Sequence, residues 1–590
     1  MELELYIRPA IFITLYLIFG GKIVLRALKN LLKGQIFDEN FLMSLATIGA
    51  LIIGEYPEAV GVMLFYRVGE YFQDRAVTKS KKSITALMDL RPDFANLIKN
   101  GETDKVDPAS VNVGDFILVK AGEKIPLDGE VVEGQAMLDT KALTGESVPR
   151  KAAVSDTVLS GCINQNGLLT IRVTKSAGES TVAKIIELVE NAASKKAPTE
   201  NFITSFSRYY TPVVVALAAL IAFLPPLLGF GLLADWVHRG LVFLVISCPC
   251  ALVISIPLSF FGGIGGASRK GVLVKGGNYL EALNNLDIVV FDKTGTLTKG
   301  VFKVTGIQSA AGWTETQVLE YAAKAEAFSN HPIALSILKA YGAEIDKSGL
   351  SDYNEISGHG ISVKADGKTI LAGNNKLMAA NGISFTETQV IGTKVYVALD
   401  NTFIGSIVIS DEIKPDSKAA IAALKTQLSK TVMLTGDNPE IAAAVAAELN
   451  LDEYYAGLLP HEKVEKVETL AAQKKAKGKI AFVGDGINDA PVLARADIGI
   501  AMGGLGSDAA IEAADLVLMS DNISGLLEAI KIARFTKRIV WQNIILALGI
   551  KALFLVLGAA GLASMWEAVF ADVGVALLAI LNASRIIRAK

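Results

Sequence analysis

Three side chains in the second half of this sequence, Asp292, Thr435 and Asp485, lie at or just after the ends of short apolar runs. Each run has the length and composition of a buried strand. Because the carboxyl ends of parallel strands meet at one edge of a sheet, we expect these side chains to lie close together. A carboxylate at that edge can attack the terminal phosphate of a nucleotide and form an acyl-phosphate. This placement would suit a phosphoryl-transfer site with Asp292 as the nucleophile; the alternative for a lone aspartate at a strand end is chance, so the decision depends on the residues around it.

Phosphoryl transfer chiefly needs positioning and charge neutralisation, and the same region supplies both. Lys463 follows Pro460 at a predicted helix start, from which its ammonium can neutralise phosphoryl oxygens. Asp292 and Asp485 offer carboxylate oxygens to Mg²⁺, helped by the carbonyl of Thr294. The supporting residues in the neighbouring loops are Thr435, Gly436, Asp437, Asn488 and Asp489.

The composition limits the kind of protein that can hold such a site. The chain has 590 residues, of which 51% are hydrophobic and 20% are charged. This balance is too apolar for an ordinary soluble enzyme and predicts membrane helices joined to water-exposed domains. The net charge of −3 provides no overall field for binding nucleic acid. Three cysteines are too few for a disulfide framework, and we expect Cys162 to be a buried structural thiol.

Seven apolar runs are candidates for membrane helices. They are residues 7–28, 41–54, 57–75, 203–229, 241–262, 539–557 and 563–583. Basic residues follow the third run at 79–82 and the last run at 585–590, which predicts that both of these ends face the cytoplasm. An inside C-terminus after seven spans implies an outside N-terminus. The short connection 54–58 then faces outward, and its Glu58 is either an ordinary loop carboxylate or a group that helps release a cation on that side.

Metal-binding and charged side chains interrupt these runs. Cys248 and Cys250 flank Pro249, which removes a helical hydrogen bond and lets both thiols turn toward one site. Thiolates prefer soft or borderline metal ions. Asp572 and Lys551 lie in the last two runs, where a charge is costly and needs a partner. We predict a metal site of Cys248, Cys250 and Asp572 with Lys551 as the counter-ion; the alternative is a salt bridge that only fixes helix packing.

Two polar regions are expected to carry the remaining chemistry. Residues 79–195 contain short alternating strands separated by Gly and Asp turns, which predicts a β-rich module. Within it, Glu146 lies on a loop with Thr144 and Gly145, from which a carboxylate can orient a water molecule toward a phosphoryl group. Residues 301–410 are typical of an inserted α/β domain.

The run Asp-Lys-Thr-Gly-Thr-Leu-Thr at 292–298 resembles the phosphorylation signature of the P-type ATPases, and Thr-Gly-Glu-Ser at 144–147 resembles their dephosphorylation loop. The resemblance implies an ion pump in which ATP phosphorylates Asp292 and Glu146 promotes hydrolysis of the product. Related phosphatases usually carry an acid–base aspartate two residues after the nucleophile, where this chain has Thr294. We therefore expect the acyl-phosphate to persist until Glu146 arrives.

Cys-Pro-Cys ahead of Asp292 is similar to the heavy-metal branch of this family. Lys551 and Asp572, with Trp566 and Gly574, resemble the zinc, cadmium and lead exporters within the branch. The resemblance also implies a nucleotide pocket, in which glycines let the backbone approach the nucleotide closely. The pocket residues would be Glu326, His331, Gly358, Gly360 and Asn374.

The fold that this resemblance implies is a multidomain membrane protein with about seven transmembrane helices in an α-helical bundle. To the bundle are joined a β-rich actuator domain, a Rossmann-like α/β phosphorylation domain and an inserted α/β nucleotide-binding domain. We expect membrane helices in 1–78, 196–268 and 529–590, the actuator in 79–195, the phosphorylation domain in 269–300 and 409–528, and the nucleotide domain in 301–408. Typical relatives carry a soluble metal-binding module and one more helix ahead of the position of residue 1.

We therefore expect a multi-pass cell-membrane enzyme with cytoplasmic catalytic domains that uses ATP and Mg²⁺ to export Zn²⁺, Cd²⁺ or Pb²⁺. Its expected partners are membrane lipid and these ions, and the basic surface near Lys22, Arg26 and Lys29 is a candidate site for a metal donor. The alternatives are a copper(I) pump, a membrane-anchored phosphatase and a passive metal channel. A monovalent thiolate site needs no carboxylate, Thr294 and the 144–147 loop argue against a phosphatase, and a channel leaves the nucleotide pocket unexplained.

Overall fold

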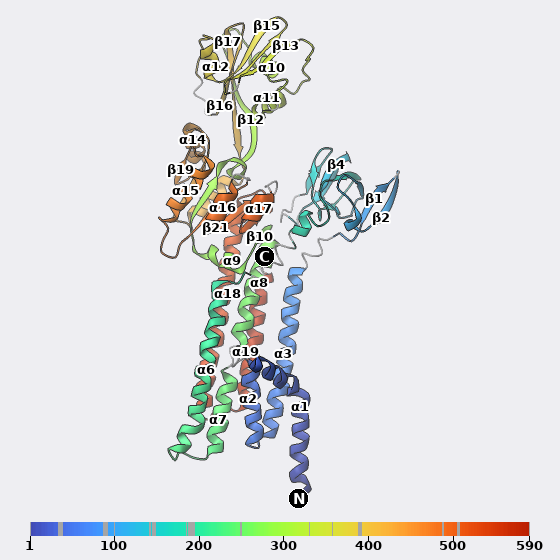
Figure 1. The fold of residues 1–590 in the computed structure, drawn as a ribbon. Coiled ribbons are helices and arrows are strands. Elements are labelled where there is room, and N and C mark those ends of the chain that lie inside the picture. The colour runs from blue at the N-terminus through green and yellow to red at the C-terminus, as the bar shows by residue number, and fades with distance from the viewer. Residues whose placement is uncertain are drawn as a thin grey trace. The chain divides into compact units, whose positions relative to one another are not determined.

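The structure is a computed structural model in which the chain divides into two compact units, 1–285 with 528–590, and 286–527. Figure 1 traces the chain from the N-terminus in blue to the C-terminus in red. The residues described are 2–588 without 34–38, 86–91, 100, 141–142, 144–148, 185, 187–194, 248–249, 330, 357, 388–391, 486–488 and 504–507. The predicted site residues Thr144, Gly145, Glu146, Cys248 and Asn488 lie outside these ranges.

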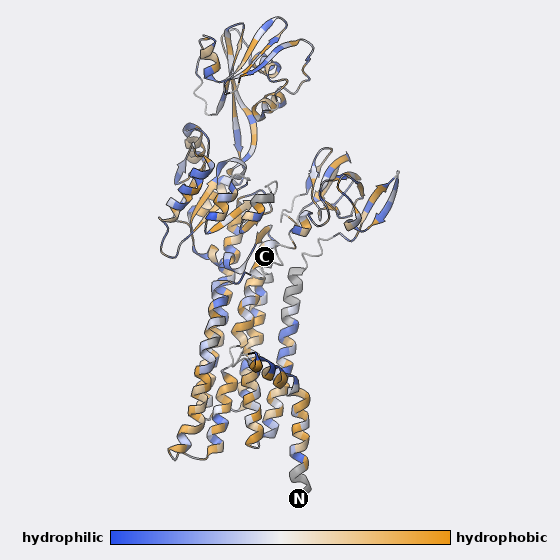
Figure 2. Cartoon of the chain, viewed as in Figure 1, coloured by the Kyte–Doolittle hydropathy of each residue, from blue (hydrophilic) through white to orange (hydrophobic). Residues whose placement is uncertain are grey.

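Long helices form the membrane part of the first unit, and Figure 2 shows hydrophobic residues along them. They are α1 (Glu2–Leu32), α2 (Glu39–Ile52), α3 (Tyr56–Thr85), α6 (Pro198–Leu227), α7 (Leu233–Ile246), α8 (Cys250–Ser268), α18 (Ser524–Ala559) and α19 (Met565–Arg588). By length and composition, five helical stretches among the described residues could cross a membrane: 7–32, 209–227, 233–268, 524–559 and 565–586. Each of the seven predicted runs falls on one helix, or for 241–262 on the pair α7 and α8.

The third predicted span differs from the others because α3 continues to Thr85, well beyond the apolar run. Arg67 and Glu70 lie on it and form an ion pair of 2.7 Å. Charges of this kind keep α3 out of the set of long apolar helices, although it packs among them. The hydrophobic core of the bundle includes Met63 of this helix at 0% exposure. The helix therefore combines an apolar face toward its neighbours with a charged one.

Small residues let α3 and α19 approach closely. A Cβ atom at Gly61 would lie 1.9 Å from the Trp566 ring, and one at Gly69 would lie 2.7 Å from Val573. Gly61 and Gly69 are about two helical turns apart and so share one face of α3. The contact holds in place the turn of α19 that carries Asp572.

The polar part of the first unit is built from short antiparallel strands, as predicted for the β-rich module. One sheet has the order β2-β1-β3-β9-β4-β7 and another the order β6-β5-β8. Cys162 directly precedes β8 and is buried at 2% exposure. Burial raises the pKa of its thiol to about 12. The strands are β1 (Ala95–Lys99), β2 (Glu102–Val106), β3 (Phe116–Val119), β4 (Gly129–Gly134), β5 (Ala136–Asp139), β6 (Arg150–Ala152), β7 (Thr157–Val158), β8 (Ile163–Asn164) and β9 (Leu169–Val173).

The second unit contains a parallel sheet, whose strands within this unit have the order β22-β21-β20-β11-β18-β19. The central strand β11 pairs in parallel with β18 on one side and β20 on the other. Its residues are almost all buried, as expected for a strand covered on both faces. The strands are β11 (Leu286–Asp292), β18 (Lys430–Leu434), β19 (Glu453–Tyr455), β20 (Lys479–Gly484), β21 (Ile498–Met502) and β22 (Leu516–Leu518). The helices beside it include α13 (Ser417–Lys425), α14 (Pro439–Leu449), α15 (Pro460–Ala471), α16 (Ala490–Arg495) and α17 (Asp508–Ala513).

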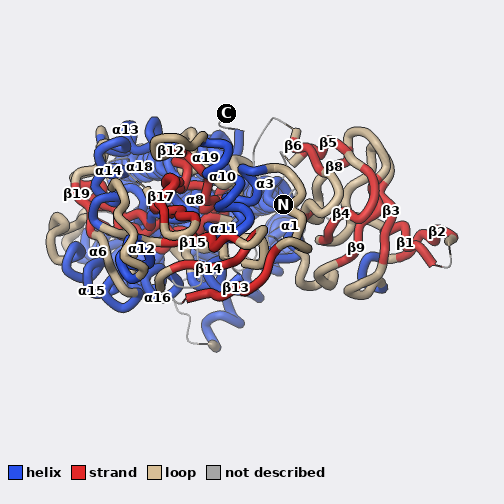
Figure 3. Tube along the Cα trace, turned by 90° about the horizontal axis from the view of Figure 1, so that it is seen from above, coloured by secondary structure: helices blue, strands red, loops and turns tan. Residues whose placement is uncertain are grey.

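The second unit also contains an antiparallel sheet, with strands in the order β12-β17-β16-β15-β14-β13. In the chain it lies between β11 and β18. Figure 3 shows β13, β14 and β15 side by side, in agreement with their pairing. The predicted boundaries 300/301 and 408/409 fall inside its two long strands and remain predictions. The elements are β12 (Thr298–Ser309), β13 (Leu350–Ile356), β14 (Gly360–Ala365), β15 (Lys368–Gly373), β16 (Thr393–Leu399) and β17 (Thr402–Ile413), with α10 (Glu315–Ala325), α11 (Pro332–Tyr341) and α12 (Asn375–Ala380).

Candidate functional site

Asp292 is the last residue of β11 and is buried at 6% exposure. Lys463, on the first turn of α15, places its Nζ 2.5 Å from Asp292 Oδ1 and 3.0 Å from Asp489 Oδ1. A buried ammonium between two carboxylates is held firmly because each charge compensates another. The ammonium predicted to neutralise phosphoryl oxygens therefore lies directly beside the predicted nucleophile.

Three carboxylates meet at this strand edge: oxygens of Asp292, Asp485 and Asp489 all lie within 4.8 Å of one another. Burial, and then repulsion from Asp489, raise the pKa of Asp292 to about 7. Burial, and then Asp489, raise the pKa of Asp485 to about 6. Carboxylate oxygens in this number and spacing suit Mg²⁺, whose charge would offset the repulsion. Their placement fits the predicted use of Asp292 and Asp485 for Mg²⁺; the assignment of the Thr294 carbonyl stays a prediction.

The loop after Asp292 is anchored by residues that sequence reasoning did not assign. Lys414 Nζ donates to the Gly295 carbonyl at 2.6 Å and to Asp521 Oδ1 at 3.0 Å. Gly295 has a φ of +71°, and a Cβ atom there would lie 1.5 Å from Asp485 Oδ2. Only glycine therefore allows the loop to pass so close to the carboxylate. The sequence around Lys414 has no pattern that predicts these contacts, because Gly295 and Asp521 lie far from it in the chain.

A second ionic cluster joins Lys293 to the loop after β18. Lys293 is buried and forms an ion pair with Asp437, and its Nζ lies 3.9 Å from Asp411 Oδ2. Within the loop, the backbone N–H of Asp437 donates to Thr435 Oγ1 at 3.1 Å. The structure therefore brings the predicted residues Thr435 and Asp437 together, with Gly436 between them in the chain. Lys293 and Asp411 are additional members.

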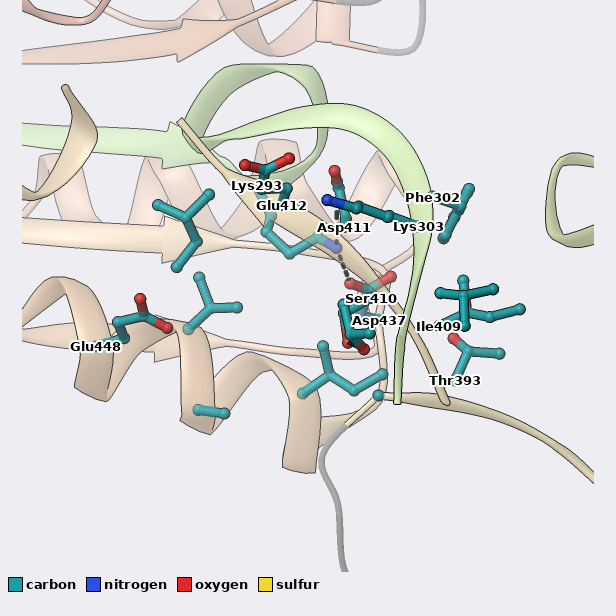
Figure 4. A pocket seen from close by; sticks show the side chains of 17 residues that line it. Lys293, Phe302, Lys303, Thr393, Ile409, Ser410, Asp411, Glu412, Asp437 and Glu448 are labelled. Atoms are coloured by element: carbon teal, nitrogen blue, oxygen red, sulfur yellow. Dashed lines mark hydrogen bonds and ion pairs between the residues drawn. The ribbon is translucent and has the colours of Figure 1, made fainter. Parts of the chain in front are cut away.

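This cluster borders a cavity of about 710 Å³ between β12, β17 and α14. Figure 4 shows Lys293 pointing toward Asp411 and Asp437 at its wall, with Lys303 close by. Glu412 and Glu448 also line it. Because its wall contains the residue after Asp292, the cavity belongs to the site already described.

Three of the predicted nucleotide residues, Gly358, Gly360 and Asn374, lie together and are called the glycine group. Asn374 Nδ2 donates to the Gly358 carbonyl at 2.8 Å, and Asn374 caps α12. Gly360 has a φ of +142°, and a Cβ atom there would lie 2.3 Å from the Ala372 carbonyl oxygen. His331 is exposed and accepts a hydrogen bond from Ile333 N at 3.2 Å through Nδ1. Among the described residues, no hydrogen bond joins His331 to the glycine group.

Glu326, the fifth of these residues, follows α10 and is buried at 6% exposure. Burial, and then the nearby Glu355 carboxylate, raise its pKa to about 7. Glu355 precedes Ile356, which pairs with Gly360 across β13 and β14. Glu326 therefore lies near the glycine group, and at neutral pH its carboxyl group can either donate or accept a hydrogen bond.

Inside the helical bundle, Lys551 of α18 and Asp572 of α19 are both buried and lie 2.5 Å apart from Nζ to Oδ1. Lys551 also donates to the carbonyl of Ile246 at 3.0 Å. Ile246 ends α7, and buried Cys250 begins α8. The structure therefore brings Lys551 and Asp572 together, as predicted, and places the pair at the end of α7.

Glu58 lies in the first turn of α3, where its carboxylate Oε2 is 2.8 Å from Nε2 of His238 on α7. His238 was not assigned by sequence reasoning. Its position between Trp236 and Arg239 gives no sign of a partner so distant in sequence.

Two family matches agree with this geometry. Residues 286–497, which include Asp292, Lys463 and Asp489, match the haloacid dehalogenase-like hydrolases. Residues 89–190 match the P-type ATPase actuator domain.

The chain is 60% identical to the cadmium, zinc and cobalt-transporting ATPase of Bacillus subtilis over 98% of its own length and 83% of that protein. The chain belongs to the heavy-metal-transporting P-type ATPases. It is also 58% identical to a zinc-transporting ATPase of Synechocystis, covering 98% of this chain and 80% of that one. A solved zinc-transporting PIB-type ATPase in the E2.Pi state is 38% identical with a TM-score of 0.65, covering 100% of this chain and 97% of the other.

Membership of the heavy-metal-transporting P-type ATPases confirms the predicted family and fold class. The chain is a multi-pass membrane enzyme whose catalytic domains are cytoplasmic and which hydrolyses ATP with Mg²⁺.

Proposed function

We propose that this ATPase exports Zn²⁺, Cd²⁺ or Pb²⁺, driven by an aspartyl-phosphate at Asp292. The carrying observation is the buried pair of Lys551 and Asp572 beside the α7 end. Burying a carboxylate inside the membrane costs free energy, so such a residue usually has a function. A carboxylate is also a suitable ligand for a divalent ion. Relatives named for cadmium, zinc, cobalt and lead support this choice over the copper(I) pump. Since cobalt is among those names, Co²⁺ joins the candidates.

In the proposed reaction, the carboxylate of Asp292 attacks the γ-phosphate of ATP. Lys463, 2.5 Å from that carboxylate, offsets charge on the nucleophile and then on the transferred group. Mg²⁺ held by Asp292 and Asp485 would supply further positive charge at the phosphoryl oxygens. Thr435 offers a hydroxyl to the same oxygens, and Asp489 keeps Lys463 in place. Asn488, Gly436 and Asp437 are assigned supporting roles.

The nucleotide base is proposed to bind beside the glycine group. Gly358 and Gly360 expose backbone there, and Asn374 fixes the turn through its bond to the Gly358 carbonyl. Glu326 offers a carboxyl group that can match the donors and acceptors of the base. His331, which is exposed, would close against the base when it binds.

Hydrolysis of the aspartyl-phosphate is assigned to the loop of Thr144, Gly145 and Glu146. Glu146 would orient the attacking water. Thr294 is exposed and has no carboxylate, so residues close to Asp292 in sequence offer no general base for early hydrolysis. The intermediate can then last long enough to drive a conformational change.

For transport, we propose that Cys248, Cys250 and Asp572 hold the ion. When the ion leaves, Lys551 forms an ion pair with Asp572. A sulfur and carboxylate set suits borderline and soft divalent ions. Glu58 is the proposed first group on the outward path. No counter-transported cation is needed, because Lys551 already supplies the charge.

A metal donor at the basic surface remains part of this proposal. Lys22, Arg26 and Lys29 are all exposed on α1. Arg26 is partly engaged, since its guanidinium lies 2.5 Å from Glu70. An acidic donor protein would therefore meet mainly Lys22 and Lys29.

The decisive experiment is ATPase activity of purified, reconstituted protein with a panel of metals. We expect stimulation by Zn²⁺, Cd²⁺ and Pb²⁺ and none by Cu(I), and the panel includes Co²⁺ as a further candidate. Asp292→Asn should abolish both the activity and an acid-stable phosphoenzyme formed from ATP. Stimulation by Cu(I) alone, or equal activity with and without metal, would refute the proposal.

A further inference from the structure

The proposed function uses Glu58 alone on the outward path and gives no role to its contact with His238. The two side chains come from α7 and α3 and approach to 2.8 Å, with His238 28% and Glu58 18% exposed. An imidazole nitrogen and a carboxylate oxygen are both ordinary zinc ligands. The pair is therefore partly open to the surroundings and chemically able to take a metal ion.

Its position along the helices places it outward from the proposed transport site. His238 precedes Ile246, the residue whose carbonyl contacts Lys551, by about 12 Å of helix at 1.5 Å per residue. Glu58 lies in the first turn of α3, whose other end leads to the cytoplasmic strand β1. Both helices thus place the pair on the side of the transport site away from the cytoplasm.

The charged residues next to the pair leave room for a cation. Arg239, the next residue on α7, lies with its guanidinium 4.4 Å from the Trp236 ring centre. A Cβ atom at Gly561 would lie 2.7 Å from the same guanidinium, so Arg239 packs against the chain beyond α18. Its charge is thereby directed to Trp236 and Gly561.

We propose that His238 and Glu58 form a second, weaker metal site that receives the ion from the Cys248, Cys250 and Asp572 site on its way out. Two protein ligands leave the other positions of a four-coordinate zinc ion to water, which makes the site suited to release. The inference rests on the proposed function and adds His238, a specific ligand, to the outward path. Metal rebinding from outside would occupy this pair first.

His238→Gln separates ligation from hydrogen bonding. Glutamine keeps a donor for Glu58 but is a poor zinc ligand, whereas His238→Cys restores a good one. Asp235→Asn is the matched control, because Asp235 is an exposed, metal-capable side chain on the same helix outside the pair. Each variant is reconstituted in vesicles with the catalytic domains outward, so that the lumen corresponds to the outer side.

The measurement is inhibition of zinc-stimulated ATPase activity by Zn²⁺ loaded in the lumen. We expect His238→Gln to raise the half-inhibiting lumenal concentration about tenfold, and His238→Cys and Asp235→Asn to behave like the unaltered protein. The bath Zn²⁺ needed for half-maximal phosphorylation should not change. Unaltered inhibition in His238→Gln, or a matching change in bath activation, would overturn the inference. No zinc-dependent phosphorylation in the unaltered protein would instead refute the proposed function.

A second measurement does not depend on turnover. Diethyl pyrocarbonate modifies accessible histidines, and mass spectrometry reports the extent at His238 in the unaltered protein. Lumenal Zn²⁺ should protect His238, and Glu58→Gln should remove that protection. Equal modification with and without lumenal Zn²⁺ would overturn the inference even if the His238 variants fail to fold.

Discussion

Asp292 has to be ionised to act as a nucleophile, yet its surroundings favour the protonated form. Desolvation and the Asp489 carboxylate outweigh the attraction of Lys463, and the result is a pKa of about 7. Under the proposed use of Asp292 for Mg²⁺, a proton and the ion compete for the same oxygens. At the scale of single residues, this competition makes the reaction sensitive to both.

The rate of phosphoenzyme formation from ATP should fall as the pH drops through about 7. The sign follows from the raised pKa, since below it Asp292 carries a proton and cannot attack. Raising free Mg²⁺ should move the midpoint to lower pH, because the cation binds only the ionised carboxylates. Rapid-quench measurements at several pH values and Mg²⁺ concentrations test this. A midpoint pH that does not change with Mg²⁺ concentration would contradict binding of the proton and Mg²⁺ to the same carboxylates.

Lys414→Ala should slow phosphoenzyme formation about tenfold, since the Gly295 carbonyl loses its bond and the loop beside Asp485 loosens. The effect should include a higher Mg²⁺ requirement. Lys418→Ala is the control, because Lys418 is exposed nearby on α13. Equal rates and Mg²⁺ dependence in the two variants would show that Lys414 only supports the fold.

At the scale of elements, the end of α7 and the close contact of α3 with α19 position the pair of Lys551 and Asp572. The carbonyl of Ile246, the last residue of α7, accepts a hydrogen bond from Lys551, and the glycine face of α3 positions the turn that carries Asp572. The pair therefore depends on how α3, α7, α18 and α19 meet.

Lys551→Met should leave metal-dependent phosphorylation but slow metal release and dephosphorylation. Once the ion leaves, Asp572 would be buried without its partner, which costs about 3–5 kcal/mol. Phosphoenzyme should therefore accumulate, as measured by its decay after a chase with unlabelled ATP. Lys537→Met, at an exposed lysine on the same helix, should decay normally. Normal decay in Lys551→Met would remove the counter-ion role.

At the scale of the whole molecule, phosphorylation in one unit must be coupled to ion movement in the other. Glu146→Gln should stop the cycle after phosphorylation, so that metal and ATP produce phosphoenzyme while steady-state hydrolysis falls at least about a hundredfold. Glu133→Gln, an exposed glutamate of the same β-rich module, is the control. Ordinary turnover in Glu146→Gln would assign hydrolysis of the aspartyl-phosphate to another residue.

The sequence alone determined the elements and the residue types. Residues 288–291 of β11 form an apolar run because both faces of the strand are buried, so the position of Asp292 at a strand end could be predicted. Membrane runs were likewise visible from length and hydropathy, although the charged α3 extends further than its apolar run indicated.

Only the tertiary structure decided which distant side chains meet. Lys414 reaches Gly295, Lys293 pairs with Asp437, and His238 pairs with Glu58, and none of these contacts has a local pattern. Local propensity and periodicity describe neighbours in the chain, whereas these contacts depend on helix packing and on the register of paired strands. Buried polar groups are then paired by the geometry that packing leaves available.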